Sequence, residues 1–264
     1  MFCILSRRLI TVFLTFGIFV IANIAAASEQ VGIILLHGKG SYDHSDKPIG
    51  SLRDALVDAG YLTELPTLPW ERSRRYDATV EQAFDEIDSA AARLKQKGAT
   101  RIIVAGQSMG GGIGISYVAR RNTASDLIVI APGHVPDSPL WRKRFASDVI
   151  KAKGMISSGR GHEFGTFGDR NQGKNSSLSV RADVYLSYFD PDGSAAMRKS
   201  AAQLRPGTNV LWIVEEHRVK NFSAKSFDSI PSSVNAEYSV IDSSHRDAPE
   251  NSIGAVIAWL KKLP

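Results

Sequence analysis

The chain has 264 residues, of which 43% are hydrophobic and 22% are charged, and its formal net charge is +5. These proportions are typical of globular proteins and exclude a disordered or fibrous chain, while the length suits one α/β domain better than two. The net charge is too small to indicate a nucleic-acid partner. Cys3 is the single cysteine, which excludes disulfide frameworks, cysteine nucleophiles and CxxC metal sites.

The first residues have the pattern of an export signal. Arg7 and Arg8 precede an apolar run from Leu9 to Ala27, and small residues at positions 25–28 match a signal-peptidase site. We therefore predict a cleaved signal peptide over residues 1–27, and a mature protein of residues 28–264 in the bacterial periplasm or outside the cell. An uncleaved membrane anchor is the alternative, because the apolar run is nearly long enough to span a bilayer. After cleavage we expect a monomer that is not bound to the membrane.

Short apolar runs alternate with helical stretches along the mature chain. Their continuous apolar character predicts parallel strands buried on both faces of a sheet. The predicted strands are Val31–Leu36, Arg101–Ala105, Asp126–Ala131, Asn209–Val214 and Glu237–Ile241. Apolar residues at helical spacing from Val80 to Leu94, after a possible cap at Asp77, predict a crossover helix, and the same spacing predicts a last helix from Ile253 to Leu260. The fold class is therefore α/β, with a mostly parallel, doubly wound sheet.

One long segment interrupts this alternation. Residues 136–202 contain no clear strand, and residues 159–175 are rich in glycine and polar side chains. Insertions of this length in a compact α/β domain are usually functional or mobile. We predict a helical and loop-containing cap over about residues 136–202, with a helix near Trp141 to Lys153. Its polar composition argues against a lipid-binding lid.

A GxSxG pattern follows one predicted strand, at Gly106-Gln107-Ser108-Met109-Gly110. In a tight strand-to-helix turn, small residues two before and two after the serine let its hydroxyl stand above the sheet. The pattern alone is weak because glycine and serine are common residues. Its context strengthens it, since a predicted strand precedes it and residues 111–121 can form a helix after it.

Two other segments lie at the same predicted edge of the sheet. The first strand of the mature chain ends in His37-Gly38-Lys39-Gly40, a glycine-rich turn that can direct a backbone N–H toward Ser108. We interpret His37 itself as structural. The last strand leads into a loop that contains His245, where a histidine can act as general base to a serine.

The order of HGxG turn, crossover, GxSxG elbow, long insertion and late histidine resembles the α/β-hydrolase superfamily, over the chain from Val31 onward. Within it, the sequence resembles uncharacterised exported bacterial serine hydrolases, with a sheet that lacks the first antiparallel strands. The resemblance implies Ser108 as nucleophile, His245 as general base, and the N–H groups of Lys39 and Met109 as oxyanion hole. It implies hydrolysis of an ester, thioester or similar acyl bond of a small molecule through an acyl-serine intermediate, without a cofactor.

Several residues are candidates for the acid that orients the histidine. The family places an aspartate shortly after the strand that corresponds to residues 209–214, but this turn reads Glu215-Glu216-His217-Arg218. We favour Glu216 as the acid, with Glu215 beside it as the near alternative. Asp137, which follows another strand, and Asp190, in the insertion, remain further candidates.

Because the usual acid is displaced, a second hypothesis stays open: a catalytically weak or inactive α/β-hydrolase fold that acts as a binding module in the cell envelope. Peptide hydrolysis would use the same triad and cannot be separated from esterase action by the sequence. A metal site is not expected, because the remaining histidines lie in separate loops without helical ligand spacing. These histidines are His44, His134, His162 and His217. The basic clusters at residues 72–75 and 142–144 are interpreted as solvated surface.

Overall fold

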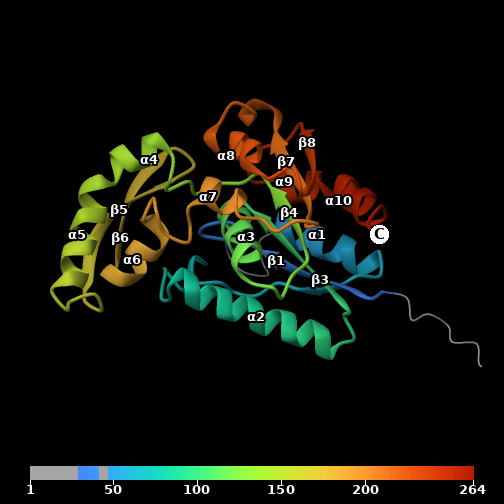
Figure 1. Ribbon diagram of the computed structural model, residues 1–264, viewed down its shortest axis with the longest axis horizontal. Coiled ribbons are helices and arrows are strands. Elements are labelled where there is room, and N and C mark those ends of the chain that lie inside the picture. The colour runs from blue at the N-terminus through green and yellow to red at the C-terminus, as the bar shows by residue number, and fades with distance from the viewer. Residues whose placement is uncertain (1–28, 42–46) are drawn as a thin grey trace, which may run out of the picture.

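A computed structural model describes residues 29–41 and 47–264 (Figure 1). The predicted signal peptide over residues 1–27 and His44 lie outside the described residues. Within these two ranges, the structure has no helix that is both long enough and apolar enough to cross a bilayer.

Six parallel strands form the central sheet in the order β2-β1-β3-β4-β7-β8. Their bounds are β1 Val31–Leu36, β2 Leu62–Glu64, β3 Arg101–Gln107, β4 Asp126–Ile130, β7 Asn209–Glu215 and β8 Asn235–Ile241. The predicted fold class is confirmed. The connection after β1 leads to β2 on one side of it, whereas the connection after β3 leads to β4 on the other side, so the direction of strand addition reverses between β1 and β3. A crevice at the carboxyl ends of strands on either side of such a switch point is the usual ligand site of open α/β sheets.

Helices cover both faces of this sheet (Figure 1). Alternate residues of β1, such as Ile33 and Ile34, belong to two different core clusters and are fully buried. One cluster includes α2 (Val80–Gln96) and α3 (Met109–Arg120), and the other includes α1 (Lys47–Asp58) and α10 (Ile253–Leu260). Burial of both faces explains the unbroken apolar runs of the central strands.

Three details of the predicted elements are corrected. The strand β8 was predicted to be buried on both faces, but Tyr238 and Val240 are 37% and 48% exposed because β8 is the last strand of the sheet. The helix α2 is capped by Thr79, whose side chain accepts a hydrogen bond from the Gln82 N–H in a capping box, and not by Asp77. The elements α1 and β2 were not predicted. The strand β2 was missed because its three residues form no recognisable apolar run.

The segment between β4 and β7 lies mostly at one end of the molecule, and its last helix returns to lie beside α3 (Figure 1). It contains α4 (Pro139–Arg144), α5 (Ala146–Ser157), β5 (Phe164–Asn171), β6 (Lys174–Arg181), α6 (Ala182–Phe189) and α7 (Met197–Ala201). We call this segment the cap. Three rings hold it together, since Phe167 stacks on Tyr185 at 4.4 Å and Tyr185 stacks on Phe189 at 4.3 Å between centroids.

The absence of a strand from residues 136–202 was a wrong prediction. β5 and β6 form an antiparallel hairpin, and its two-residue turn, Gln172-Gly173, has positive φ at both positions, 46° and 83°. Such a turn matches the twist of paired strands. Most side chains of the two strands are exposed or half-buried, so the apolar run that identifies a buried strand is missing.

Candidate active site

Ser108 occupies a strained turn between β3 and α3. Its φ of 53° and ψ of −116° lie in a region that costs a non-glycine residue about 1–3 kcal/mol. Three backbone hydrogen bonds hold it there: its N–H donates to the Ile130 carbonyl at 3.0 Å, and its carbonyl accepts from the N–H groups of Gly112 and Gly133 at 3.1 and 2.9 Å. The hydroxyl is thereby raised above the carboxyl edge of the sheet.

The two glycines of the GxSxG pattern are required by close backbone contacts. A Cβ atom on Gly110 would lie 2.2 Å from the carbonyl oxygen of Leu36, and one on Gly106 would lie 2.3 Å from the carbonyl oxygen of Gly110. The elbow therefore packs directly on β1, which brings Ser108 beside the glycine-rich turn that follows that strand.

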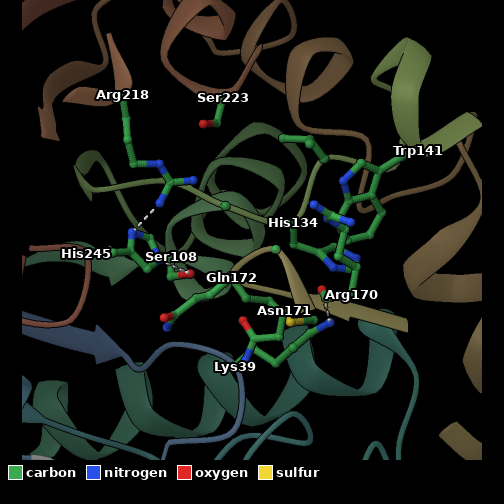
Figure 2. Close-up of a pocket in the computed structure, with 14 residues that line it drawn as sticks. Lys39, Ser108, His134, Trp141, Arg170, Asn171, Gln172, Arg218, Ser223 and His245 are labelled. Atoms are coloured by element: carbon green, nitrogen blue, oxygen red, sulfur yellow. Dashed lines mark hydrogen bonds between the residues drawn. The ribbon is translucent and has the colours of Figure 1, made fainter. Parts of the chain in front are cut away.

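His245 connects the serine to a carboxylate. Its Nε2 lies 2.9 Å from Ser108 Oγ, and its Nδ1 lies 2.6 Å from Glu215 Oε1 (Figure 2 shows Ser108 and His245). The loop that carries His245 is fixed from the elbow itself, because Gln107 Nε2 donates to the His245 carbonyl at 3.1 Å. The order of serine, histidine and acid is the arrangement that activates a hydroxyl nucleophile.

The structure places Glu215 against the histidine, and not Glu216, which was favoured. The strand β7 extends one residue further than predicted, so Glu215 is its last residue and its side chain is 1% exposed. Glu216 begins the 3-10 turn that follows and is exposed to solvent. The other candidates are engaged elsewhere: Asp137 Oδ2 accepts from the N–H groups of α7, and Asp190 pairs with a lysine of α5.

Glu215 is held in its ionised form. Burial by itself would raise the pKa of this carboxyl group. The hydrogen bond with His245 and the positive charge of Arg218 outweigh burial and hold the pKa of Glu215 below its usual range. A carboxylate that is charged and buried can orient the imidazole and stabilise its protonated form.

Arg218 also belongs to the candidate site, and the sequence did not indicate it. Its Nη1 lies 3.3 Å from Glu215 Oε1 and 2.5 Å from His245 Nδ1 (dashed line in Figure 2). Nδ1 can donate its hydrogen to Glu215 or accept one from Arg218, but not both. Only the first arrangement leaves Nε2 free to accept the serine proton. Glu215 and Arg218 therefore compete for the tautomer of His245.

The backbone N–H groups of Lys39 and Met109 are available to a ligand. In the described part of the chain neither group has a hydrogen-bond partner, and both residues line the cavity at Ser108. Met109 is the first residue of α3, where helical N–H groups are unpaired and favour negative charge. The turn that presents Lys39 is fixed by His37, whose Nε2 accepts from the Leu68 N–H at 3.1 Å. This role agrees with the structural interpretation of His37.

The side chain of Lys39 extends away from the sheet into the cap. Its Nζ forms an ion pair with Asp169 of β5 at 2.5 Å, with the two side chains only 9% and 6% exposed. Burial lowers the pKa of Lys39, and Asp169 opposes that shift. The ring centroids of Tyr76, Trp141 and Phe189 lie 5.6–6.0 Å from Nζ. A single residue thus joins the candidate oxyanion turn to the cap hairpin.

A cavity of about 140 Å³ opens over Ser108 between the sheet edge and the cap hairpin (Figure 2). Ser108, Met109 and His245 line its floor, the hairpin tip at residues 170–173 forms one wall, and Trp141 borders it. This volume is below the usual range of about 300–1,000 Å³ for drug-sized ligands, so only a short group fits beside the serine.

The segment at residues 133–135 supplies another wall of this cavity. Gly133 approaches Ser108 so closely that a Cβ there would lie 3.0 Å from Ser108 Oγ. His134, at φ 61°, is buried, and its Nε2 contacts the Tyr188 carbonyl at 2.8 Å. Burial, and then the charge of Lys39, lower the pKa of His134 to about 3, so the ring is neutral. Its buried Nδ1 has no hydrogen-bond partner among the described residues.

Among residues 29–41 and 47–264, no group of three or more histidine, cysteine, aspartate or glutamate side chains is placed to hold a metal ion. No family model and no curated protein sequence matches the chain.

Solved structures do match. Similar ones include the α/β hydrolase GrgF from Penicillium sp. sh18 (12% identity, TM-score 0.61, 89% of each chain covered) and a monoacylglycerol lipase from Paleococcus ferrophilus (18%, 0.58, 87% of this chain and 93% of that one). Est1E from Butyrivibrio proteoclasticus, solved with ferulic acid, is 14% identical with a TM-score of 0.57 and 90% of each chain covered. Together with the parallel sheet and its flanking helices, these likenesses establish that the chain has the α/β-hydrolase fold.

Proposed function

We propose that the protein is a serine hydrolase that cleaves a small ester, thioester or similar acyl bond through an acyl-serine intermediate. The observation that carries the proposal is the continuous contact from Ser108 Oγ to His245 Nε2 at 2.9 Å and from His245 Nδ1 to Glu215 Oε1 at 2.6 Å. No cofactor is needed for this chemistry.

In the proposed reaction, Ser108 Oγ attacks the acyl carbon while its proton passes to His245 Nε2. The negative charge that develops on the carbonyl oxygen is stabilised by the N–H groups of Lys39 and Met109. His245 then gives the proton to the leaving oxygen or sulfur, and the acyl-serine ester remains. Water repeats the sequence on this ester and releases the acid, with Glu215 stabilising the imidazolium in both halves.

The matched structures support this choice of chemistry, since they include a monoacylglycerol lipase and a thioesterase domain from the curacin biosynthetic pathway. The residues N-terminal to the described domain, with their predicted signal peptide, support action in the periplasm or outside the cell. We propose a monomer with a small-molecule acyl substrate as its partner.

The binding-module hypothesis was motivated by the missing acid. Because Glu215 stands within hydrogen-bond distance of His245, that motivation is removed, and the hydrolase proposal is preferred. Only an experiment can separate peptide hydrolysis from ester hydrolysis. Short acyl esters and aminoacyl amides are assayed side by side, and activity confined to the amides would contradict the esterase proposal.

A fluorophosphonate tests the nucleophile without requiring the natural substrate. The protein purified after expression of the full chain is exposed to the reagent, and its intact mass is measured beside Ser108→Ala and His245→Ala. We expect a single adduct on the wild type and none on either variant. A folded wild type that acquires no adduct would favour the binding module.

A further inference from the structure

The cavity over Ser108 has an unequal distribution of charge. Among the residues that the structure describes, its lining includes Lys39, Arg170 and Arg218 but no aspartate or glutamate. Lys39 is neutralised by Asp169, and Arg218 lies beside the Glu215 carboxylate. Arg170 has no carboxylate partner among the described residues, so one full positive charge on the cavity wall is left without a counterion.

A second arginine approaches the same place. Arg170 Nη1 donates to Asn175 Oδ1 at 3.1 Å, and Arg144 Nη1 donates to the same oxygen at 2.9 Å. Arg144 also has no carboxylate partner within the described ranges. Two guanidinium groups therefore converge on one neutral amide oxygen, which concentrates positive charge at this place. Arg144 belongs to the basic cluster at residues 142–144 that the sequence analysis interpreted as solvated surface.

The position of Arg170 relates this charge to the reaction. Residue 170 lies on β5, two residues before the hairpin turn that overhangs the serine, and it is half-buried. Figure 2 shows Arg170 on the side of the cavity opposite His245, with Ser108 between them. A substrate whose acyl carbon reaches Ser108 would extend along the cavity wall toward Arg170, because the space beside the serine holds only a short group.

We propose that Arg170, assisted by Arg144, which shares the Asn175 side chain with it, binds an anionic group of the substrate, so that the enzyme prefers acyl esters that carry a carboxylate or phosphate. A guanidinium matches both groups through paired N–H donors. This inference rests on the proposed hydrolase function and adds to it the substrate class and a specificity-determining residue outside the triad.

Matched pairs of substrates test the preference in the protein purified after expression of the full chain. One pair is mono-4-nitrophenyl glutarate and its methyl ester, which differ only in the distal carboxylate. The other is acetylglycerol phosphate and acetylglycerol, which place a phosphate on the alcohol side. We expect kcat/KM for the charged member of one pair to exceed that of its neutral twin by about tenfold, the usual effect of a hydrogen bond to a charged group. The pair that shows the preference identifies the anion and its side of the ester.

Arginine variants then assign the preference to a residue. Arg170→Met should remove the difference in kcat/KM between the charged and neutral members of the pair, mainly by raising KM for the charged member. Arg170→Lys should retain part of that difference, because the charge remains without the fork. Arg160→Met is the matched control, since Arg160 is 54% exposed on the cap and is not among the residues that line the cavity. Equal kcat/KM within both pairs, or a preference that survives in Arg170→Met, overturns the proposal.

A binding measurement separates this inference from the proposed function. Calorimetry with the Ser108→Ala variant compares monomethyl glutarate and glycerol phosphate with dimethyl glutarate and glycerol. Selective binding of an anion that Arg170→Met abolishes, in a protein that hydrolyses no ester and takes up no fluorophosphonate, would refute the hydrolase and keep the anion site. Hydrolysis of neutral esters with no anion preference in either assay refutes the anion site alone.

Discussion

Replacing Glu215 by glutamine removes one negative charge from the candidate triad and preserves the size of the side chain. In the wild type, the carboxylate lies 2.6 Å from His245 Nδ1 and holds the hydrogen on that nitrogen. Glutamine lacks the charge that outweighs Arg218, whose Nη1 is already 2.5 Å from Nδ1. We expect Glu215→Gln to shift the ring to the tautomer in which Nδ1 accepts from Arg218 and Nε2 carries the hydrogen. That tautomer cannot accept the proton of the serine.

The magnitude follows from this loss of the base. In serine proteases the equivalent carboxylate-to-amide change lowers kcat by about four orders of magnitude, with the wrong tautomer as the cause. At about 1.4 kcal/mol for each factor of ten, that is about 5.5 kcal/mol of transition-state stabilisation. We expect a comparable loss here, since Glu215 is 1% exposed and water cannot replace it.

The assay is kcat for 4-nitrophenyl acetate together with the rate of fluorophosphonate labelling, measured for Glu215→Gln and for Glu216→Gln. Glu216 is adjacent, has the same charge and is exposed, so its variant controls for the change in net charge. Thermal unfolding of both variants controls for folding. The reasoning is refuted if Glu216→Gln loses the activity, or if folded Glu215→Gln retains more than about a tenth of it.

Three further predictions concern stability. Gly110→Ala should destabilise the protein by more than about 3 kcal/mol in urea unfolding, because its Cβ would lie 2.2 Å from a backbone oxygen of β1. Gly154→Ala is the control: a Cβ at residue 154 would have no atom within 4 Å, so this change should be neutral or stabilising by up to about 1 kcal/mol. Lys39→Met should lower the free energy of unfolding by about 3–5 kcal/mol, because it leaves Asp169 buried without its partner. The Lys39→Met/Asp169→Leu double variant should recover much of this loss. A double variant no more stable than the single one would contradict the ion-pair argument. Hydrogen bonds and an ion pair hold the pKa of Asp126 below its usual range despite burial, so its contribution to the free energy of unfolding is present at neutral pH and is lost as the pH falls below about 4. The urea midpoint of Asp126→Asn should therefore vary less with pH below about 4 than that of the wild type. An equal pH dependence of the two midpoints would exclude Asp126 as a cause.

The central sheet could be predicted because its strands are buried on both faces. Burial there demands a continuous apolar run, and the runs at Val31–Leu36 and Asn209–Val214 match β1 and all but the last residue of β7. The edge strand β8 was located for the same reason, but its exposure was not predicted, since strand order is set by long-range pairing that no local pattern records. The cap hairpin was missed because polar strands have no apolar period.

In the candidate site, the serine elbow and the late histidine could be located because steric and topological rules restrict them. The choice between Glu215 and Glu216 could not be made, because it depends on where β7 ends. One more residue in the extended conformation turns the side chain of Glu215 toward His245 and leaves Glu216 in solvent. Arg218 and Arg170 were beyond sequence reasoning for a different reason, since a charged residue acquires a role only from the partners that the fold places beside it.

The division between a predictable core and an unpredictable cap is consistent with the proposed place of substrate selection in the cap. The elbow packs so closely on β1 that a Cβ on Gly110 would lie 2.2 Å from the Leu36 carbonyl oxygen, so it tolerates little variation. The hairpin tip at residues 170–173 lines the cavity and is exposed or half-buried, so packing restricts its side chains less than it restricts the elbow. Lys39 connects the two parts, because in the proposed reaction its backbone N–H faces the reacting carbonyl while its side chain pairs with Asp169, the neighbour of Arg170. If both proposals hold, a change in the hairpin that disturbs this ion pair will alter catalysis as well as selectivity, because the proposed anion site and the proposed oxyanion hole share the Lys39–Asp169 contact.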